Sequence, residues 1–189
     1  MSRARVLADF VGGTTTISGT PTFTGTVTGA GKDWTKTSAQ SIVGVASSTI
    51  TGLPSTIEEI IIFGNGVQRG TTSGNGMVIR LGDSGGLESS GYVQPPVYNS
   101  GGTYYINAAA EQTGLEVGYY DSVNNFVARC WNISGNKWKM ESHAFTHTGT
   151  KYWTTSMCEK ELSATLDRVA VSDANGTNFA AGTFQFWYK

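Results

Sequence analysis

The stretch FVARCWNISGNKWKMESHAF, residues 126–145, decides the fold. Its first part alternates with period two, which places four side chains on one face of an extended chain: Val127, Arg129, Trp131 and Ile133. Its second part also alternates, with apolar side chains opposite charged ones: Trp138 and Met140 against Lys137, Lys139 and Glu141. The Ser134-Gly135-Asn136 segment between them has the chemistry of a hairpin turn. We therefore expect two antiparallel strands of a sheet that buries one face.

Further short strands are predicted on both sides of this hairpin, because turn signals recur roughly every ten to fifteen residues. Eight of the expected ranges can be named: 57–63, 76–81, 115–120, 126–133, 137–145, 151–157, 165–171 and 182–189. The apolar run Ile60-Ile-Ile-Phe63 indicates a central strand buried on both faces, which the turn residues Gly64-Asn65-Gly66 should end. Nine or ten such strands predict an all-β domain over residues 34–189. We expect a jelly-roll-like antiparallel β-sandwich, with a barrel as the alternative.

The composition supports this fold class. Only 14% of the 189 residues are charged, 25 are glycine and 39% are hydrophobic. Glycine, threonine and serine form helices poorly, so a helical bundle is disfavoured. The hydrophobic fraction is too high for a disordered chain, which indicates a folded domain with its own core.

Charge and hydropathy exclude several function classes. The net charge of −1 and the absence of a basic stripe argue against a nucleic-acid partner. No apolar run approaches the ~20 residues that cross a bilayer, so no membrane partner is expected. The first eleven residues lack the apolar stretch of a secretion signal, which predicts synthesis and folding in a cytoplasm. Cys130 and Cys158 are therefore expected to be reduced and buried, and a bridge between them would require neighbouring strands and an oxidising compartment.

The N-terminal residues 1–33 differ from the rest of the chain in composition and in residue pattern. Residues 2–10 predict a short helix that is too small to be stable alone, and Gly12-Gly13 should end it. Residues 14–31 form a Thr/Gly-rich arm in which threonine alternates with other residues from Thr20 to Thr28, as in an extended strand that needs a partner. A flexible linker is the alternative. We expect this segment to dock on another protein through six side chains: Arg3, Arg5, Leu7, Phe10, Phe23 and Val27.

Gly82-Asp83-Ser84-Gly85-Gly86 matches the nucleophile signature of chymotrypsin-like proteases. The histidine that should precede such a serine is missing, because His143 and His147 both follow Ser84. A β-turn in which Asp83 and Ser84 bond the local backbone is the expected structure. No catalytic residue is therefore predicted.

The histidine pair and the acids give no stronger signal. On a strand, residues four apart are about 13 Å apart, too far for His143 and His147 to share one metal ion. No paired carboxylates can be picked from the acids, so no glycosidase is predicted: Glu58, Glu59, Glu111, Glu116, Asp121 and Glu141. No metal and no cofactor are expected.

Adjacent aromatic residues in an extended chain point to opposite faces, so one member of each pair should be exposed. Exposed aromatic rings on a β-sandwich stack against sugars or pack against other subunits. The candidate glycan contacts are Tyr119, Tyr120, Tyr152 and Trp153.

Several blocks, taken in order, resemble virion structural proteins of tailed bacteriophages, of the tail-fibre and head-decoration type. They are the start MSRARVLA, the segment 50–67 (ITGLPSTIEEIIIFGNGV), the segment 78–92 (VIRLGDSGGLESSGY), and the segments 166–169 and 176–188 at the end. The resemblance covers about residues 1–10 and 50–189. Ala180 departs from the family pattern, which has an aspartate in that turn.

The resemblance implies a non-enzymatic protein on the exterior of a phage particle, made in the cytoplasm of the host bacterium. Its implied partners are further copies of itself, as a homotrimer, and other virion proteins such as major capsid or tail proteins. A location on the head or on the tail remains open. The alternative is a receptor-recognition module that binds a host-surface glycan.

Overall fold

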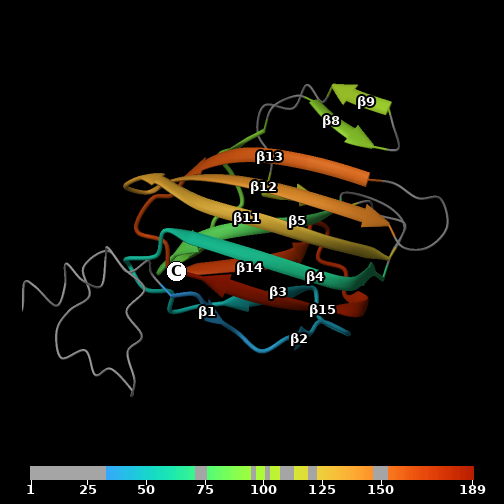
Figure 1. Ribbon diagram of the computed structural model, residues 1–189, viewed down its shortest axis with the longest axis horizontal. Coiled ribbons are helices and arrows are strands. Elements are labelled where there is room, and N and C mark those ends of the chain that lie inside the picture. The colour runs from blue at the N-terminus through green and yellow to red at the C-terminus, as the bar shows by residue number, and fades with distance from the viewer. Residues whose placement is uncertain are drawn as a thin grey trace, which may run out of the picture. The chain divides into compact units, whose positions relative to one another are not determined.

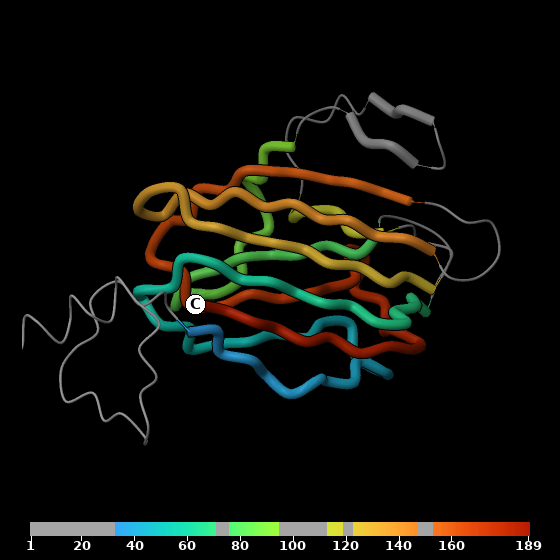
Figure 2. The backbone as a smooth tube through the Cα atoms, in the orientation of Figure 1, coloured from blue at the N-terminus to red at the C-terminus, as the bar shows by residue number. Residues whose placement is uncertain are grey.

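The structure is a computed structural model that describes residues 33–70, 76–94, 97–100, 103–106, 113–118, 123–146 and 153–189. Residues Asp33–Lys189 form one compact unit. The predicted helix at 2–10, the arm at 14–31 and all six docking residues lie outside the described residues. Within the described part the fold is all-β and contains no helix, as the composition predicted (Figures 1 and 2).

Ten strands form the larger of two antiparallel sheets, here called the wide sheet. Their bounds are Thr35–Lys36 (β1), Gln40–Ser41 (β2), Glu59–Arg69 (β4), Tyr92–Val93 (β7), Val97–Ser100 (β8), Thr103–Ile106 (β9), Asn124–Ser134 (β11), Lys137–Thr146 (β12), Trp153–Glu161 (β13) and Phe179–Tyr188 (β15). The order is β1-β15-β4-β11-β12-β13-β8-β9, with β2 beside β15 and β7 beside β13.

Five strands form the second, narrow sheet. They are Ser47–Ile50 (β3), Met77–Asp83 (β5), Gly86–Leu87 (β6), Leu115–Val117 (β10) and Arg168–Asp173 (β14). The order is β10-β5-β14-β3, with β6 beside β5. In Figure 1, β4, β11, β12 and β13 lie in front and β5 and β14 lie behind, so the two sheets form two layers.

One hydrophobic core draws on both sheets. From the wide sheet it takes the inward side chains of alternating strands, such as Ile60, Ile62, Phe184 and Phe186. The narrow sheet contributes among others the buried Ile79, Leu81, Val169 and Val171. Because each wide-sheet strand turns every second side chain to this core, the other side chains form the outer face of the wide sheet.

The hairpin that decides the fold is confirmed. β11 and β12 pair antiparallel around Gly135, which has a φ of 54° and so needs the conformational freedom of glycine. Trp138 and Met140 are buried, whereas Lys137 is exposed and Lys139 and Glu141 are half-buried on the opposite face. The last strand is also confirmed, because Phe184 and Phe186 are buried on one face.

Two sequence predictions for β4 are wrong. The strand does not end at Gly64-Asn65-Gly66 but continues to Arg69, because two register shifts against β15 and one against β11 absorb the glycines within the ladder. The strand is also not buried on both faces, since Phe63 is exposed and Ile61 is only half-buried. The strands buried on both faces are β5 and β14 instead. The count of nine or ten strands is also too low, because several elements have only two residues.

Candidate functional site

The outer face of the wide sheet is the most distinctive surface of the described residues. Backbone register aligns its side chains in rows that cross five strands: β15, β4, β11, β12 and β13. An antiparallel sheet ordinarily packs one face on the core and leaves the other face polar and solvated. Here the rows differ from one end of the strands to the other, so the face is polar at one end only.

At one end lies a charged row, made of Lys189, Glu59, Trp131, Lys139 and Glu159. The Lys189 Nζ atom is 3.0 Å from Glu59 Oε2, and the Arg129 Nε atom also pairs with Glu59. Burial raises the pKa of Glu59, but the hydrogen bonds from Lys189 and Arg129 outweigh that effect and hold it below its ordinary value. Positive and negative side chains therefore neutralise one another across this row.

Arg129 and Trp187 belong to the next row along the strands, beside Ile61, Glu141 and Met157. The Arg129 guanidinium carbon lies 5.6 Å from the centre of the Trp131 ring in the charged row. Trp187 packs edge-on against Phe63, with their ring centres 5.5 Å apart. This second row is thus the transition from charged to aromatic side chains.

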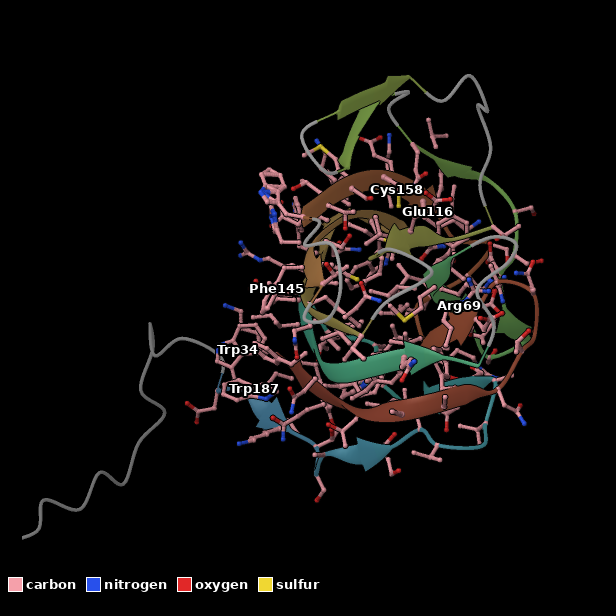
Figure 3. The ribbon with its side chains drawn as sticks, turned by 90° about the vertical axis from the view of Figure 1, so that its right-hand side faces the viewer. Trp34, Arg69, Glu116, Phe145, Cys158 and Trp187 are labelled. Atoms are coloured by element: carbon pink, nitrogen blue, oxygen red, sulfur yellow. The ribbon has the colours of Figure 1, made fainter. Side chains whose placement is uncertain are left out.

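The other end of the face is largely apolar. Phe63 on β4 lies opposite Val127 on β11, and Phe145 on β12 lies opposite Trp153 on β13. These four side chains surround a hollow of about 640 Å³, here called the aromatic groove. Phe145 and Trp153 are 55% and 57% exposed, so the groove opens to solvent. Figure 3 shows Phe145, Trp34 and Trp187 on the same side of the wide sheet.

Two polar side chains of the groove have partners within the sheet. The Oδ1 atom of Asn125 accepts a hydrogen bond of 2.9 Å from the Gly66 amide. His143 Nδ1 lies 3.3 Å from Thr155 Oγ1 in the neighbouring strand. The groove therefore presents the rings of Phe63, Phe145 and Trp153 beside the polar side chains of Asn65 and His143.

The structure brings only one predicted glycan contact, Trp153, to this site. Tyr119, Tyr120 and Tyr152 lie outside the described residues. Sequence reasoning missed Phe63, Val127 and Phe145 as site residues. A signal was present for Phe145, because it interrupts the polar face of the alternating strand 137–145 with a large aromatic ring.

The Gly82–Gly86 segment is a local turn, as predicted. It joins β5 to β6, and the Gly85 amide donates a 2.7 Å hydrogen bond to Asp83 Oδ1. A second hydrogen bond, 2.6 Å from Ser163 Oγ to Asp83 Oδ2, holds the pKa of Asp83 below its ordinary value. Ser84 lies in this turn of the narrow sheet, whereas His143 lies on the outer face of the wide sheet. These two residues therefore form no serine–histidine dyad.

A polar network surrounds that turn. Ser163 Oγ is 3.0 Å from Glu88 Oε1, and Glu88 pairs with the buried Lys160. The buried Tyr92 hydroxyl accepts a 2.8 Å bond from the Leu81 amide and lies 3.1 Å from the Glu88 carbonyl oxygen. Each of these groups has a hydrogen-bond or ion-pair partner in the network, and these interactions hold the β5–β6 hairpin in place.

The remaining candidates are structural or isolated. His143 is exposed on a strand, as predicted, and His147 lies outside the described residues. Of the six acids, Glu111 and Asp121 also lie outside. Glu58 is exposed, Glu59 and Glu141 lie on the outer face, and Glu116 is on β10, where burial raises its pKa. Within the described ranges, no group of three or more His, Cys, Asp or Glu residues could hold a metal ion.

The cysteines are free and buried, as predicted. Met140 on β12 stands between Cys130 on β11 and Cys158 on β13, and its sulfur lies 3.7 Å from that of Cys158. The two cysteines are therefore on strands that do not pair with each other. Burial raises the pKa of both thiols, and that of Cys158 to about 12.

No protein-family model, curated protein or solved structure matches this chain. Among the residues that the structure describes, no helix is long and apolar enough to span a bilayer.

Proposed function

We propose that the protein is a non-enzymatic structural subunit on the exterior of a tailed-phage particle, as capsid decoration, head fibre or tail-fibre-like component. The observation that supports this most is the aromatic groove at the open end of the wide sheet. A contiguous exposed apolar patch on a folded domain marks a surface that contacts another macromolecule. The order of the sequence blocks supplies the phage context.

The same proposal includes a jelly-roll fold. Four strands of the wide sheet, in the order β1-β15-β4-β11, face four strands of the narrow sheet, in the order β3-β14-β5-β10. Along the chain, β1 and β4 belong to the wide sheet, and β3 and β5, which each follow one of them, belong to the narrow sheet. Later in the chain, β14 lies between β3 and β5, and β15 lies between β1 and β4. This interleaving supports an arrangement of two Greek keys, an architecture that recurs in viral capsid and lectin domains. β12 and β13 then extend the wide sheet.

In this proposal residues 1–33 attach the subunit to the particle, and the β-domain packs against further copies as a homotrimer. The attachment residues are those named from the sequence: Arg3, Arg5, Leu7, Phe10, Phe23 and Val27. The other partners are major capsid or tail proteins. The protein would be made in the host bacterial cytoplasm and reside on the outside of the virion.

Particle incorporation tests the proposed function. A variant lacking residues 1–31 should keep the near-ultraviolet circular dichroism of the full chain but should not join particles in infected cells. The control is the full chain with Met157→Ala, a change at an exposed residue of the wide sheet. This control should join particles. Normal incorporation of the shortened variant would contradict the attachment role.

A second candidate function is recognition of a host-surface glycan. Trp153 favours it, because this ring is exposed beside Phe145 and His143 in an open groove. Sugar rings stack on such aromatic faces. Purified protein should then bind host cells or an immobilised glycan, and Trp153→Ala should abolish binding. Trp131→Ala, a tryptophan of the same face outside the groove, should retain it.

A further inference from the structure

Only part of the outer face lacks partners for its side chains. In the charged row, Glu159 lies 3.4 Å from Lys137 Nζ and 3.6 Å from Lys139 Nζ, and Glu59 is paired with Arg129 and Lys189. These groups are satisfied within the subunit. The rings of Phe145 and Trp153 are more than half exposed, so burial of their exposed apolar area would be favourable. The aromatic groove is thus the part of the face where contact with another molecule is most favourable.

The chemistry of the groove fits a protein surface better than a sugar. A glycan needs hydrogen-bonding groups that replace its lost water, in addition to a stacking ring. Asn125 and His143 each use one polar atom within the sheet. Phe63, Val127 and Phe145 have no polar side-chain atoms, so an apolar side chain that packs against these three residues leaves none of their atoms unpaired.

The charges of the face are compatible with another copy of the same chain. Three basic side chains, Lys189, Lys139 and Arg129, are interleaved with three acidic ones, Glu59, Glu159 and Glu141. Because the signs alternate across neighbouring strands, two such faces meet without net repulsion. A face dominated by one sign would instead favour a partner of opposite charge.

The size of the face also meets the requirement of a stable interface. Five strands about 4.8 Å apart and about 30 Å long cover roughly 700 Å². A standard protein interface buries about 800 Å² on each partner, with an apolar centre and a polar rim. The aromatic groove would supply the apolar contact at one end of such an interface, and the charged row would form its polar edge at the other end.

We infer that the aromatic groove, with Phe63, Val127, Phe145 and Trp153, is the surface through which the β-domain packs against a second copy of this chain. This inference rests on the proposed function as a self-associating subunit and adds the surface that it uses. Apolar side chains of the second copy fill the groove. The assembly then excludes water from the end of the sheet that the isolated subunit leaves open.

A matched pair of substitutions on one strand tests the inference. Val127 and Ile133 both lie on β11 with exposed side chains, 37% and 47%, but only Val127 lines the groove. Their six-residue separation corresponds to roughly 20 Å along the strand. Light scattering during size exclusion should give the full wild-type chain a mass of two or more times 20.1 kDa. Val127→Glu should reduce the mass to that of one chain, and Ile133→Glu should leave it unchanged.

Phe145→Glu is the second variant and should also give single chains, with circular dichroism checking that each variant is folded. A wild-type protein of single-chain mass would overturn the inference, as would an assembled and folded Val127→Glu or Phe145→Glu protein. Loss of assembly in Ile133→Glu would also overturn it, because the whole face rather than the groove would then be needed. Glycan binding by wild-type single chains would assign the groove to sugar instead.

Incorporation of the same variants into particles separates this inference from the proposed function. If the wild-type chain joins particles and Val127→Glu still assembles, the surface is wrong and the structural role stands. If the wild-type chain assembles in solution but never joins particles, the virion role is wrong and the surface stands.

Discussion

Arg69 and Asp173 form an ion pair whose two side chains have no exposed surface, and the pair joins the end of β4 in the wide sheet to the end of β14 in the narrow sheet. Asp173 Oδ1 also accepts hydrogen bonds from the Asn175 and Thr177 amides, so the carboxylate orders the turn after β14. Asp173→Ala would leave the arginine charge buried without its partner. We expect this variant to lose about 3–5 kcal/mol of unfolding free energy in a urea titration.

Two controls define this effect. Glu159→Ala removes an exposed ion pair and should change stability by no more than about 1 kcal/mol. Arg69→Met combined with Asp173→Ala should be less destabilised than Asp173→Ala alone, because no unpaired charge remains. A single variant as stable as the wild type would show that the pair does not couple the sheets.

Acid should destabilise the protein. Burial raises the pKa of Glu59, Glu88 and Asp173, but ion pairs and hydrogen bonds hold the net values below those of the free side chains, and Ser163 lowers that of Asp83. A carboxyl with a lowered folded-state pKa stabilises the fold above its unfolded value, near pH 4, and this contribution disappears as the pH falls further. The contribution of these four carboxyls to the unfolding free energy, measured by urea titrations, should be constant from about pH 7 to pH 5 and decrease below about pH 4.

The pH profile contains an internal contrast. Burial raises the pKa of Glu116, so this group opposes folding when charged, and its penalty is relieved as the pH falls. Glu116→Gln should therefore be more stable than the wild type at pH 7, with a difference that shrinks toward pH 4. A loss of stability at pH 7 would show that the Glu116 carboxylate is needed in the fold.

Gly64 leaves room for the ring of Phe126 beneath the aromatic groove. A Cβ atom at position 64 would lie 2.1 Å from the ring, a distance that no real contact allows. Gly64→Ala should therefore lose about 1–3 kcal/mol through overpacking. At Gly76 the nearest atom to an added Cβ is 4.0 Å away, so Gly76→Ala is the matched control.

A compensating change distinguishes this steric account from a general effect of alanine. Phe126→Leu removes Cε1 and Cζ, two of the three ring atoms that the new methyl group meets, so it should be less harmful in the Gly64→Ala background than in the wild type. A double-mutant cycle from urea titrations measures this coupling. Additive losses would contradict the close approach.

The two thiols should be unreactive in the folded protein. Cys130 and Cys158 are buried, and their raised pKa values disfavour the reactive thiolate. A chromogenic disulfide reagent should label neither thiol in buffer and both in concentrated urea. Labelling of fewer than two thiols in urea without reductant would reveal a disulfide.

The sequence was most informative where polar and apolar side chains alternate strictly along each strand and the two paired strands follow one another in the chain. β11 and β12 show this, because their residues 126–145 define two faces and a turn without reference to the rest of the protein. The same alternation identified the buried face of β15. The all-β class followed from these patterns together with the composition.

The outer face was harder to predict because it depends on contacts between distant segments. Phe63 was expected in the core, since a continuous apolar run indicates burial on both faces. It is exposed instead, because no layer formed by the described residues covers the outer side of β4. Trp153 was found because its neighbour is also aromatic. Its proximity to Phe145 and Val127 requires the register of three strands, which no local pattern contains.

The position of β15 determines when the wide sheet can be completed. This strand lies between β1 and β4, although it follows every other element of the domain along the chain. During translation, β11, β12 and β13 can therefore pair as consecutive hairpins and join β4 while the other edge of β4 is still open. That edge closes only once residue 188 has been synthesised, so nascent chains have an unprotected strand edge that chaperones or neighbouring polysomes could engage.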